Sequence, residues 1–147
     1  MKKPELLAPM GNWTMLKAAV DAGTDAVYFG IKNLNMRSTA QNFSVEELPK
    51  IVSFCHENSV KAYLTLNIII FDDEIKEVEE TLKTAKKAGI DMVICWDMSV
   101  LSIAKKIENS NLPFNTSFCI KLRSSQVFQK IWCQKNGFCK GMQFRAD

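Results

Sequence analysis

Three short segments of similar pattern recur along the chain, each where a predicted helix ends and an apolar strand begins. They are residues 22–27 (A-G-T-D-A-V), 58–63 (N-S-V-K-A-Y) and 88–93 (A-G-I-D-M-V). They begin 36 and then 30 residues apart, about the length of one strand with its crossover helix. Strands that alternate with helices at this period predict a parallel sheet, in either a doubly wound fold or a (β/α)8 barrel.

The apolar patterns place the individual elements of this α/β fold. No G-x-G-x-x-G turn follows a strand, so a dinucleotide-binding fold is not indicated and we favour the barrel. Four or five units make only about half of one, so we expect the N-terminal half of a (β/α)8 barrel. The predicted strands are residues 5–9, 26–29, 61–70, 92–96 and a fifth beginning at 113–116, and the predicted helices are residues 13–20, 44 onward, 72–88 and 98–107.

Capping residues mark several of the predicted helix boundaries. Asn12 is an N-cap before the first helix, and Ser44 caps the second with Glu47 as its capping-box partner three residues on. Gly23 and Gly89 end the first and third helices.

Composition allows one globular domain but changes along the chain. The 147 residues are 47% hydrophobic, enough for a core, and the net charge of +3 is too weak to indicate nucleic-acid binding. Residues 1–116 hold 13 Lys/Arg and 15 Asp/Glu, whereas residues 117–147 hold 6 Lys/Arg, one Asp and three of the five cysteines. No signal peptide or membrane span is evident, which predicts a cytoplasmic protein with reduced cysteines.

Polar side chains follow the predicted strands at their carboxyl ends, where parallel α/β folds place their sites. Arg37 and Lys32 are candidates to hold a carboxylate or phosphate, and Asn35 and Asn67 to orient a polar ligand. The alternative is that this loop is polar only because it is solvated. The ligand-binding candidates are Asn12, Lys32, Asn35, Arg37, Asn67 and Trp96.

Two neighbouring residues after the fourth strand have open alternatives. Asp97 is the candidate catalytic residue, as a general base, and equally the N-cap of the helix that follows. For Trp96 we favour packing in the core over stacking on a ligand.

Other chemistries find little support. His56, the single histidine, lies beside Glu57 on a predicted helix and is expected to be a solvated surface residue. No Cys/His spacing makes a zinc site, and there is neither a G-x-S-x-G nor a Walker motif. We therefore predict no metal ligand among these residues, and Cys55 and Cys95 are expected to be small core residues.

Five ordered motifs resemble the opening of the collagenase-like peptidase family, the unclassified peptidase family numbered 32. The resemblance covers residues 3 to about 116 and implies a (β/α) barrel, with peptidase or tRNA/rRNA hydroxylation activity and a peptide or RNA substrate. It also implies an iron–sulfur cluster in full-length relatives, held by cysteines of a later region, so no cofactor is expected in this fragment. The motifs are residues 4–12 (P-E-L-L-A-P-M-G-N), 26–30 (A-V-Y-F-G), 34–37 (L-N-M-R), 62–67 (A-Y-L-T-L-N) and 93–97 (V-I-C-W-D).

Residues 117–147 depart from the family pattern. Compatible codons for this stretch, read one base later, can encode A-S-A-S-N-S-E-A-A-K, close to the Q-A-S-x-S-N-S-E-A pattern of relatives at this point. We therefore divide the chain into a partial barrel over residues 1–116 and a frameshifted tail over residues 117–147. A truncated member would be inactive alone. The alternatives are a half barrel that self-associates through its open sheet edge, and a product that folds poorly.

Overall fold

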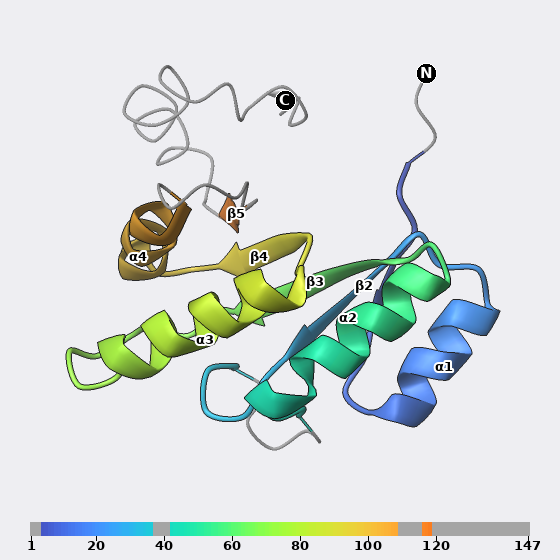
Figure 1. Cartoon of the computed structure of the whole chain (residues 1–147), viewed down its shortest axis with the longest axis horizontal. Helices are drawn as coiled ribbons and strands as arrows, with labels where there is room; N and C mark the ends of the chain where they lie inside the picture. Colours follow the sequence, from blue (N-terminus) through green and yellow to red (C-terminus); the bar gives the residue numbers. More distant parts are fainter. Residues whose placement is uncertain (1–3, 37–41, 109–115, 119–147) are drawn as a thin grey trace, which may run out of the picture.

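The computed structural model describes residues 4–36, 42–108 and 116–118, and shows strands alternating with helices as predicted (Figure 1). The fold class is therefore α/β. The elements are β1 (Leu7–Pro9), α1 (Trp13–Asp21), β2 (Ala26–Gly30), the 3-10 helix η1 (Val45–Glu47), α2 (Leu48–Glu57), β3 (Lys61–Leu66), α3 (Ile75–Ala88), β4 (Met92–Cys95), α4 (Met98–Glu108) and β5 (Thr116–Phe118).

The five strands form one parallel sheet in the order β1-β2-β3-β4-β5. Each strand pairs with the next one in the chain, as Val27 does with Ala62 and Leu64 with Val93. A doubly wound sheet instead reverses direction and places later strands on both sides of the first. The sequential order is that of a barrel wall.

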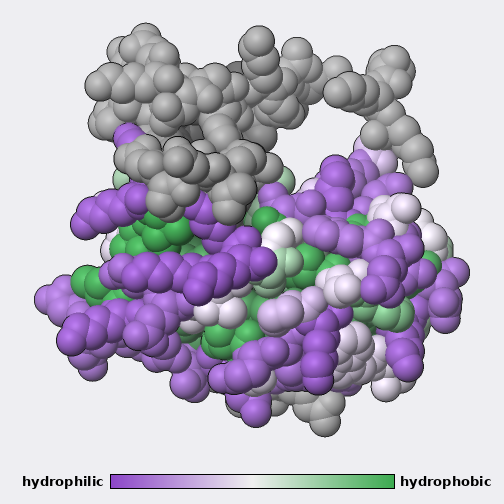
Figure 2. Space-filling model, viewed as in Figure 1, coloured by the Kyte–Doolittle hydropathy of each residue, from purple (hydrophilic) through white to green (hydrophobic). Residues whose placement is uncertain are grey.

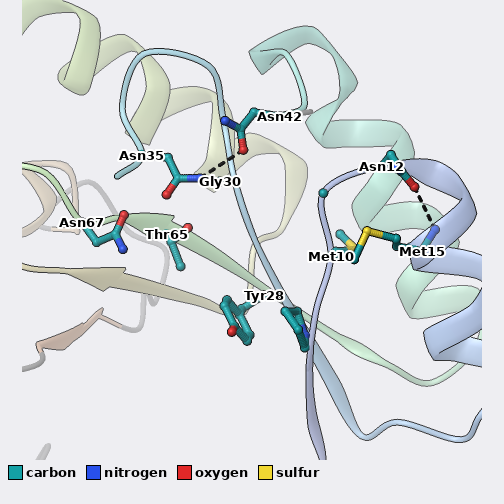
Figure 3. A pocket seen from close by; sticks show the side chains of 11 residues that line it. Met10, Asn12, Met15, Tyr28, Gly30, Asn35, Asn42, Thr65 and Asn67 are labelled. Atoms are coloured by element: carbon teal, nitrogen blue, oxygen red, sulfur yellow. Dashed lines mark hydrogen bonds between the residues drawn. The ribbon is translucent and has the colours of Figure 1, made fainter. Parts of the chain in front are cut away.

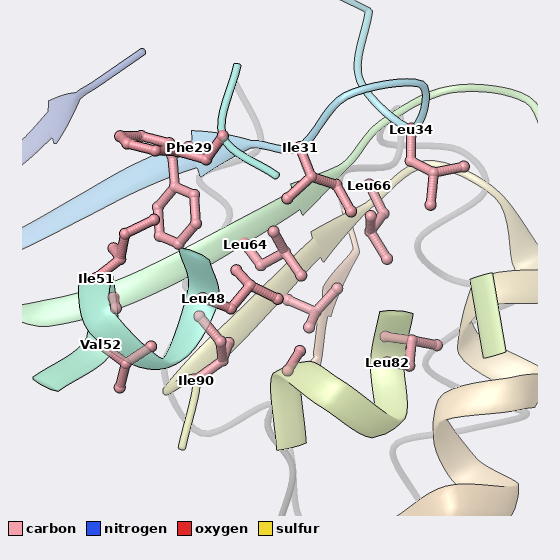
Figure 4. Packing of buried hydrophobic residues seen from close by; sticks show 14 of the residues in the cluster. Phe29, Ile31, Leu34, Leu48, Ile51, Val52, Leu64, Leu66, Leu82 and Ile90 are labelled. Atoms are coloured by element: carbon pink, nitrogen blue, oxygen red, sulfur yellow. The ribbon is translucent and has the colours of Figure 1, made fainter. Parts of the chain in front are cut away.

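One face of the sheet packs against the helices and forms the core (Figure 4). Alternate strand residues point to this face, where Phe29 and Leu64 meet Leu48 and Ile51 of α2 and Leu82 of α3, all at most 1% exposed. Each such side chain stabilises the fold by about 1.5–3 kcal/mol relative to exposure. The helices keep a hydrophilic outer surface over most of the visible face (Figure 2).

The other face of the sheet is more polar. The alternation places Tyr28, Gly30, Tyr63 and Thr65 on it, and Tyr28 pairs with Tyr63 while Gly30 pairs with Thr65. In a barrel this face is the interior. These residues therefore lead from the interior to the carboxyl ends of the strands.

The three repeated corners share one backbone geometry at their second residue. Gly23, Ser59 and Gly89 all have positive φ, at 78°, 59° and 85°. In each corner the next amide N–H donates to a carbonyl five residues earlier, as Val60 does to Cys55 at 2.9 Å and Ile90 to Ala85 at 3.1 Å. The repeat in the sequence therefore marks the end of a helix at a residue in the left-handed backbone conformation, and this ending occurs three times.

The predicted caps are confirmed. Asn12 Oδ1 accepts the Met15 N–H at 2.9 Å at the start of α1. Ser44 and Glu47 form the capping box, although it opens η1, which leads into α2 with Pro49 in the first turn. The third strand is shorter than predicted and ends at Leu66. Residues 67–70, predicted as the end of this strand, form a loop instead, because the Ile70 N–H donates to Asp97 Oδ2 at 3.1 Å.

Two further boundaries moved or lie outside the described residues. The third helix begins at Ile75 rather than Asp72, since Glu74 accepts the Phe71 N–H at 2.9 Å in a turn before it. Residues 113–115 are outside the described residues, and β5 begins at Thr116. No helix in the described part of the chain has the length and apolar character needed to span a membrane.

Candidate functional site

A pocket of about 520 Å³ lies at the carboxyl ends of β1, β2 and β3 (Figure 3). The sheet brings together at one edge three segments that are far apart in the sequence, because the strands are parallel and sequential. The lining residues are Pro9, Met10, Gly11, Asn12, Met15, Tyr28, Gly30, Asn35, Asn42, Thr65 and Asn67.

The side chain of Asn35 lies over Gly30 in the wall of this pocket (Figure 3). A Cβ atom at position 30 would lie 1.9 Å from Asn35 Nδ2, so only glycine admits this placement. Asn35 is 8% exposed and donates from Nδ2 to Asn42 Oδ1 at 3.0 Å. Because Gly30 has no side chain, β2 leaves room at this position for the buried amide of Asn35.

Thr65 and Asn67 carry the wall onto β3 and its loop. Thr65 donates from Oγ1 to the carbonyl of Phe29 at 2.9 Å, which links β3 to β2 beside the pocket. Asn67 Oδ1 accepts the N–H of Met36 at 3.3 Å. Its amide therefore connects the loop after β3 to the loop after β2.

The first wall of the pocket comes from β1 and α1. The Met10 N–H donates to the carbonyl of Tyr28 at 3.0 Å, which continues the β1–β2 pairing into the pocket. Asn12 lines the pocket while capping α1, and Met10 and Met15 add thioether side chains. Methionine adapts readily to ligand shape because it is unbranched and polarizable.

The chemistry of this lining is neutral. None of the described residues around the pocket carries a formal charge at neutral pH, and four of them are asparagines. An amide side chain both donates and accepts hydrogen bonds. The pocket therefore suits an uncharged ligand with alternating donors and acceptors, such as a peptide amide or the edge of a nucleobase.

The structure gathers only some of the predicted site residues. Asn12, Asn35 and Asn67 line the pocket, whereas Lys32 is exposed outside it and Arg37 lies outside the described residues. The sequence interpretation missed Asn42, Thr65 and Tyr28. Thr65 and Tyr28 were detectable in principle, since their strand alternation places them on the face away from the core.

Asp97 stands apart from the pocket and bonds to its neighbours. Its Oδ1 accepts the Ser99 N–H at 2.8 Å and the Ser99 hydroxyl at 2.7 Å, while Oδ2 accepts the Ile70 N–H. Burial opposes ionisation, but these hydrogen bonds outweigh it and lower the pKa of Asp97. The geometry is that of a residue capping α4, the alternative foreseen from the sequence.

Trp96 is 56% exposed, so the favoured interpretation of Trp96 as a core residue is wrong. The physical reason is that β4 ends at Cys95, whose side chain takes the last core position of the strand. Trp96 follows in the loop and points out of the core. Because the ring is exposed, it is accessible for stacking on a ligand.

The described cysteines do not fit an iron–sulfur cluster. Cys55 lies on α2 and Cys95 on β4, both buried, and burial raises the pKa of Cys55 to about 11 and that of Cys95 to about 12. No group of three or more His, Cys, Asp or Glu side chains in the described ranges could hold a metal ion. His56 is partly exposed, as expected, and its Nε2 lies 2.9 Å from Asp91 Oδ2 at the opposite end of the sheet.

Comparison with solved structures supports the barrel-like fold. The chain resembles the type I 3-dehydroquinate dehydratase of Clostridium difficile, a (β/α)8 barrel, with a TM-score of 0.53 and 14% sequence identity. The match covers 78% of this chain and 51% of the dehydratase.

Curated relatives carry two kinds of name. The chain is 43% identical to an uncharacterized protease of Methanocaldococcus jannaschii over 103 residues and 42% identical to a collagenase of Porphyromonas gingivalis over 104. It is 37% identical to tRNA hydroxylation protein P1 of Bacillus subtilis over 106. These matches cover 70%, 70% and 72% of the chain, and 25% of each relative, so the chain spans about a quarter of their length.

A family-level match confirms the resemblance seen in the sequence. Residues 11–140 match peptidase family U32. The match continues past residue 116, where the composition changes, and the frameshifted tail over residues 117–147 stays a prediction. Together with the parallel fold and the relatives, it shows that the chain belongs to peptidase family U32.

Proposed function

We propose that this chain supplies the substrate-binding part of a U32-type barrel, that it binds the main chain of a peptide, and that it is catalytically incomplete alone. The observation that carries the proposal is the asparagine-lined pocket at the carboxyl ends of β1, β2 and β3. Amide side chains complement the N–H and C=O groups of an extended peptide, since each can pair with both. The protease and collagenase names of relatives point the same way.

The proposal of incompleteness rests on what the pocket contains. Peptide hydrolysis needs a nucleophile or activated water with a base within hydrogen-bond reach. The described lining offers amides, thioethers and two hydroxyls, and the raised pKa values of Cys55 and Cys95 keep both thiols protonated at neutral pH. Asp97, the predicted base, is not among the lining residues, and its three hydrogen bonds lower its pKa and so weaken it as a base.

Binding and cleavage are tested separately. A short, blocked glycine–alanine peptide should bind the full chain in a calorimetric titration, and Asn67→Ala should weaken this binding about tenfold through lost hydrogen bonds. Asn58→Ala is the matched control, because Asn58 lies at the end of α2, away from the pocket. Cleavage is tested by incubating the chain with gelatin, and we expect no new amino termini to form. If Asn67→Ala binds the peptide as tightly as the parent chain, the pocket is not the binding site. If the chain cleaves gelatin, it is not catalytically incomplete.

A second candidate is RNA hydroxylation, favoured by the tRNA hydroxylation names of several relatives. The edge of a uracil base offers the same donor and acceptor groups as a peptide amide, so the pocket chemistry fits both. Hydroxylated uridine formed from tRNA by the chain would support this function over the peptidase class. We expect none from this chain alone.

We also propose that residues 117–147 result from a frameshift near codon 116. The change in charge, the three cysteines and the family-like alternative reading frame support this origin. Sequencing the corresponding DNA tests it, and an intact gene that encodes these residues with unrelated codons would contradict it. An iron–sulfur cluster, implied for full-length relatives, would then belong to a region outside this chain.

A further inference from the structure

Large apolar side chains gather on the loops at the carboxyl ends of β2, β3 and β4. Eight large apolar residues of the described chain are conspicuously exposed. Four of them lie on these three loops and a fifth is the first residue of α4, and these five are 51% to 71% exposed. We call these five the rim surface. They are Met36, Ile69, Phe71, Trp96 and Met98.

Hydrogen bonds hold the three loops of the rim surface next to one another. The Met36 N–H donates to Asn67, which joins the first loop to the second. The Ile70 N–H donates to Asp97, which joins the second loop to the third. The exposed side chains therefore lie on one connected edge rather than at scattered positions, and such clusters on a soluble protein mark interaction sites.

The charges beside the rim surface are predominantly negative. Residues 69–77 hold four acidic residues and one lysine, and the two neighbouring loops add Asp97 and the exposed Lys32. Asp72 and Asp73 are both exposed beside Phe71. A polyanion such as RNA, or an anionic lipid surface, would be repelled here.

We propose that the rim surface docks a polypeptide segment in which lysine or arginine residues alternate with large apolar residues. The apolar side chains of the segment would pack on Phe71 and Trp96, and its cations would face Asp72 and Asp73. The surface adjoins the pocket through Asn67, which lines the pocket and accepts the N–H of Met36 of the rim surface. The inference rests on the proposed function only in taking the ligand to be a polypeptide, and it adds basic, apolar character to that ligand.

The test is a fluorescence anisotropy titration of the full chain. The probe is a short labelled peptide in which lysines alternate with leucines and phenylalanines, and the comparison peptide has glutamate for every lysine. We expect the basic peptide to bind and the acidic one not to. Raising the salt concentration should weaken binding, because exposed charge pairs are screened.

Two sets of variants locate the binding. The double variant Phe71→Ser with Trp96→Ser should weaken binding of the basic peptide more than about tenfold, because it removes two aromatic anchors. Asp72→Asn with Asp73→Asn should weaken it less and reduce its salt dependence. Asp21→Asn with Glu80→Gln is the matched control, which removes two exposed charges on α1 and α3 and should leave binding unchanged. Circular dichroism checks that each variant is folded.

Defined results would overturn the inference. Equal binding of the basic and acidic peptides, or unchanged binding by both rim variants, excludes the docking surface. Binding of an oligouridine that is lost in Phe71→Ser with Trp96→Ser would assign the surface to RNA instead. Failure here is distinguishable from failure of the proposed function, since the neutral glycine–alanine peptide tests the pocket and requires none of these rim side chains.

Discussion

The two ends of the parallel sheet use their polar side chains in different ways. At the amino end, charged groups bond within the protein: Asp25 accepts the Leu6 N–H at 2.7 Å, and Asp91 accepts the Ala62 N–H at 2.8 Å. At the carboxyl end, neutral amides line an open pocket. In parallel barrels the first end serves stability and the second function. The difference indicates that substitutions at the carboxyl end should change ligand binding, whereas substitutions at the amino end should change stability alone.

Gly30→Ala is expected to have the largest effect, because it fills the seat of Asn35. The new Cβ would lie 1.9 Å from Asn35 Nδ2, so the amide must leave the wall. We expect loss of measurable binding of the glycine–alanine peptide and about 1–3 kcal/mol of lost stability from overpacking. Calorimetric titration and urea unfolding measure the two effects.

A second variant separates the steric effect from other causes. Gly30→Ala combined with Asn35→Gly removes the colliding side chain and should recover most of the stability but not the binding. If Gly30→Ala alone binds the peptide like the parent chain, the carboxyl-end pocket is not the binding site.

Asp91→Ala tests the amino end and should affect stability without changing binding. It removes the partner of His56 Nε2 and of the Ala62 N–H, and we expect a loss of about 1–2 kcal/mol. Urea unfolding measures this loss. Asp73→Ala, an exposed control, should change stability by no more than about 0.5 kcal/mol. A stable Asp91→Ala variant with weakened peptide binding would reverse the roles assigned to the two ends.

Much of the fold was predictable because local signals agreed with each other. The corners at Gly23 and Gly89, the cap at Asn12 and the capping box at Ser44 each depend on residues within a few positions in the sequence. The end of β3 was not predictable in this way. Residues 67–70 have strand-forming composition, but the Ile70 N–H bonds to Asp97, 27 positions later, and such a contact leaves no local sequence signal.

The candidate site was predicted less completely than the fold. Strand ends identified Asn12, Asn35 and Asn67, because parallel topology alone brings them to one edge. Lys32 was predicted together with them but does not line the pocket, since a loop sequence does not say which side chains turn inward. The dependence of Asn35 on Gly30 required coordinates, because it is a steric relation between two positions.

The Glu5–Lys61–Tyr63 cluster gives the amino end a pH dependence that the neutral pocket lacks. Glu5 lies 2.6 Å from Lys61 Nζ and accepts the Tyr63 hydroxyl at 2.7 Å. The Lys61 hydrogen bond lowers the pKa of Glu5 below 4.5, with Tyr63 adding to it and partial burial opposing it. A lowered carboxyl pKa stabilises the folded state above the unfolded value, and this stabilisation is lost as the pH falls through the folded value.

We therefore expect Glu5→Gln to unfold at lower urea concentration than the parent chain at neutral pH, with the two midpoints converging below pH 4.5. The effect should be smaller than that of Asp91→Ala because the Glu5–Lys61 pair is largely solvent-exposed. Urea midpoints at several pH values measure it. A midpoint difference that persists unchanged at acidic pH would show that the Glu5 carboxylate is not the source.

Ser59→Gly should produce the smallest effect in this series, and in the opposite direction. Ser59 occupies the left-handed position that glycine fills in the two other corners, at a φ of 59°. A side chain there carries a backbone cost that glycine avoids, so we expect a gain of about 0.5–1 kcal/mol in urea unfolding. Ser59→Ala is the control and should not stabilise, because alanine keeps the Cβ atom. Stabilisation by both variants would point to the serine hydroxyl rather than the backbone, and the three corners would then not be equivalent.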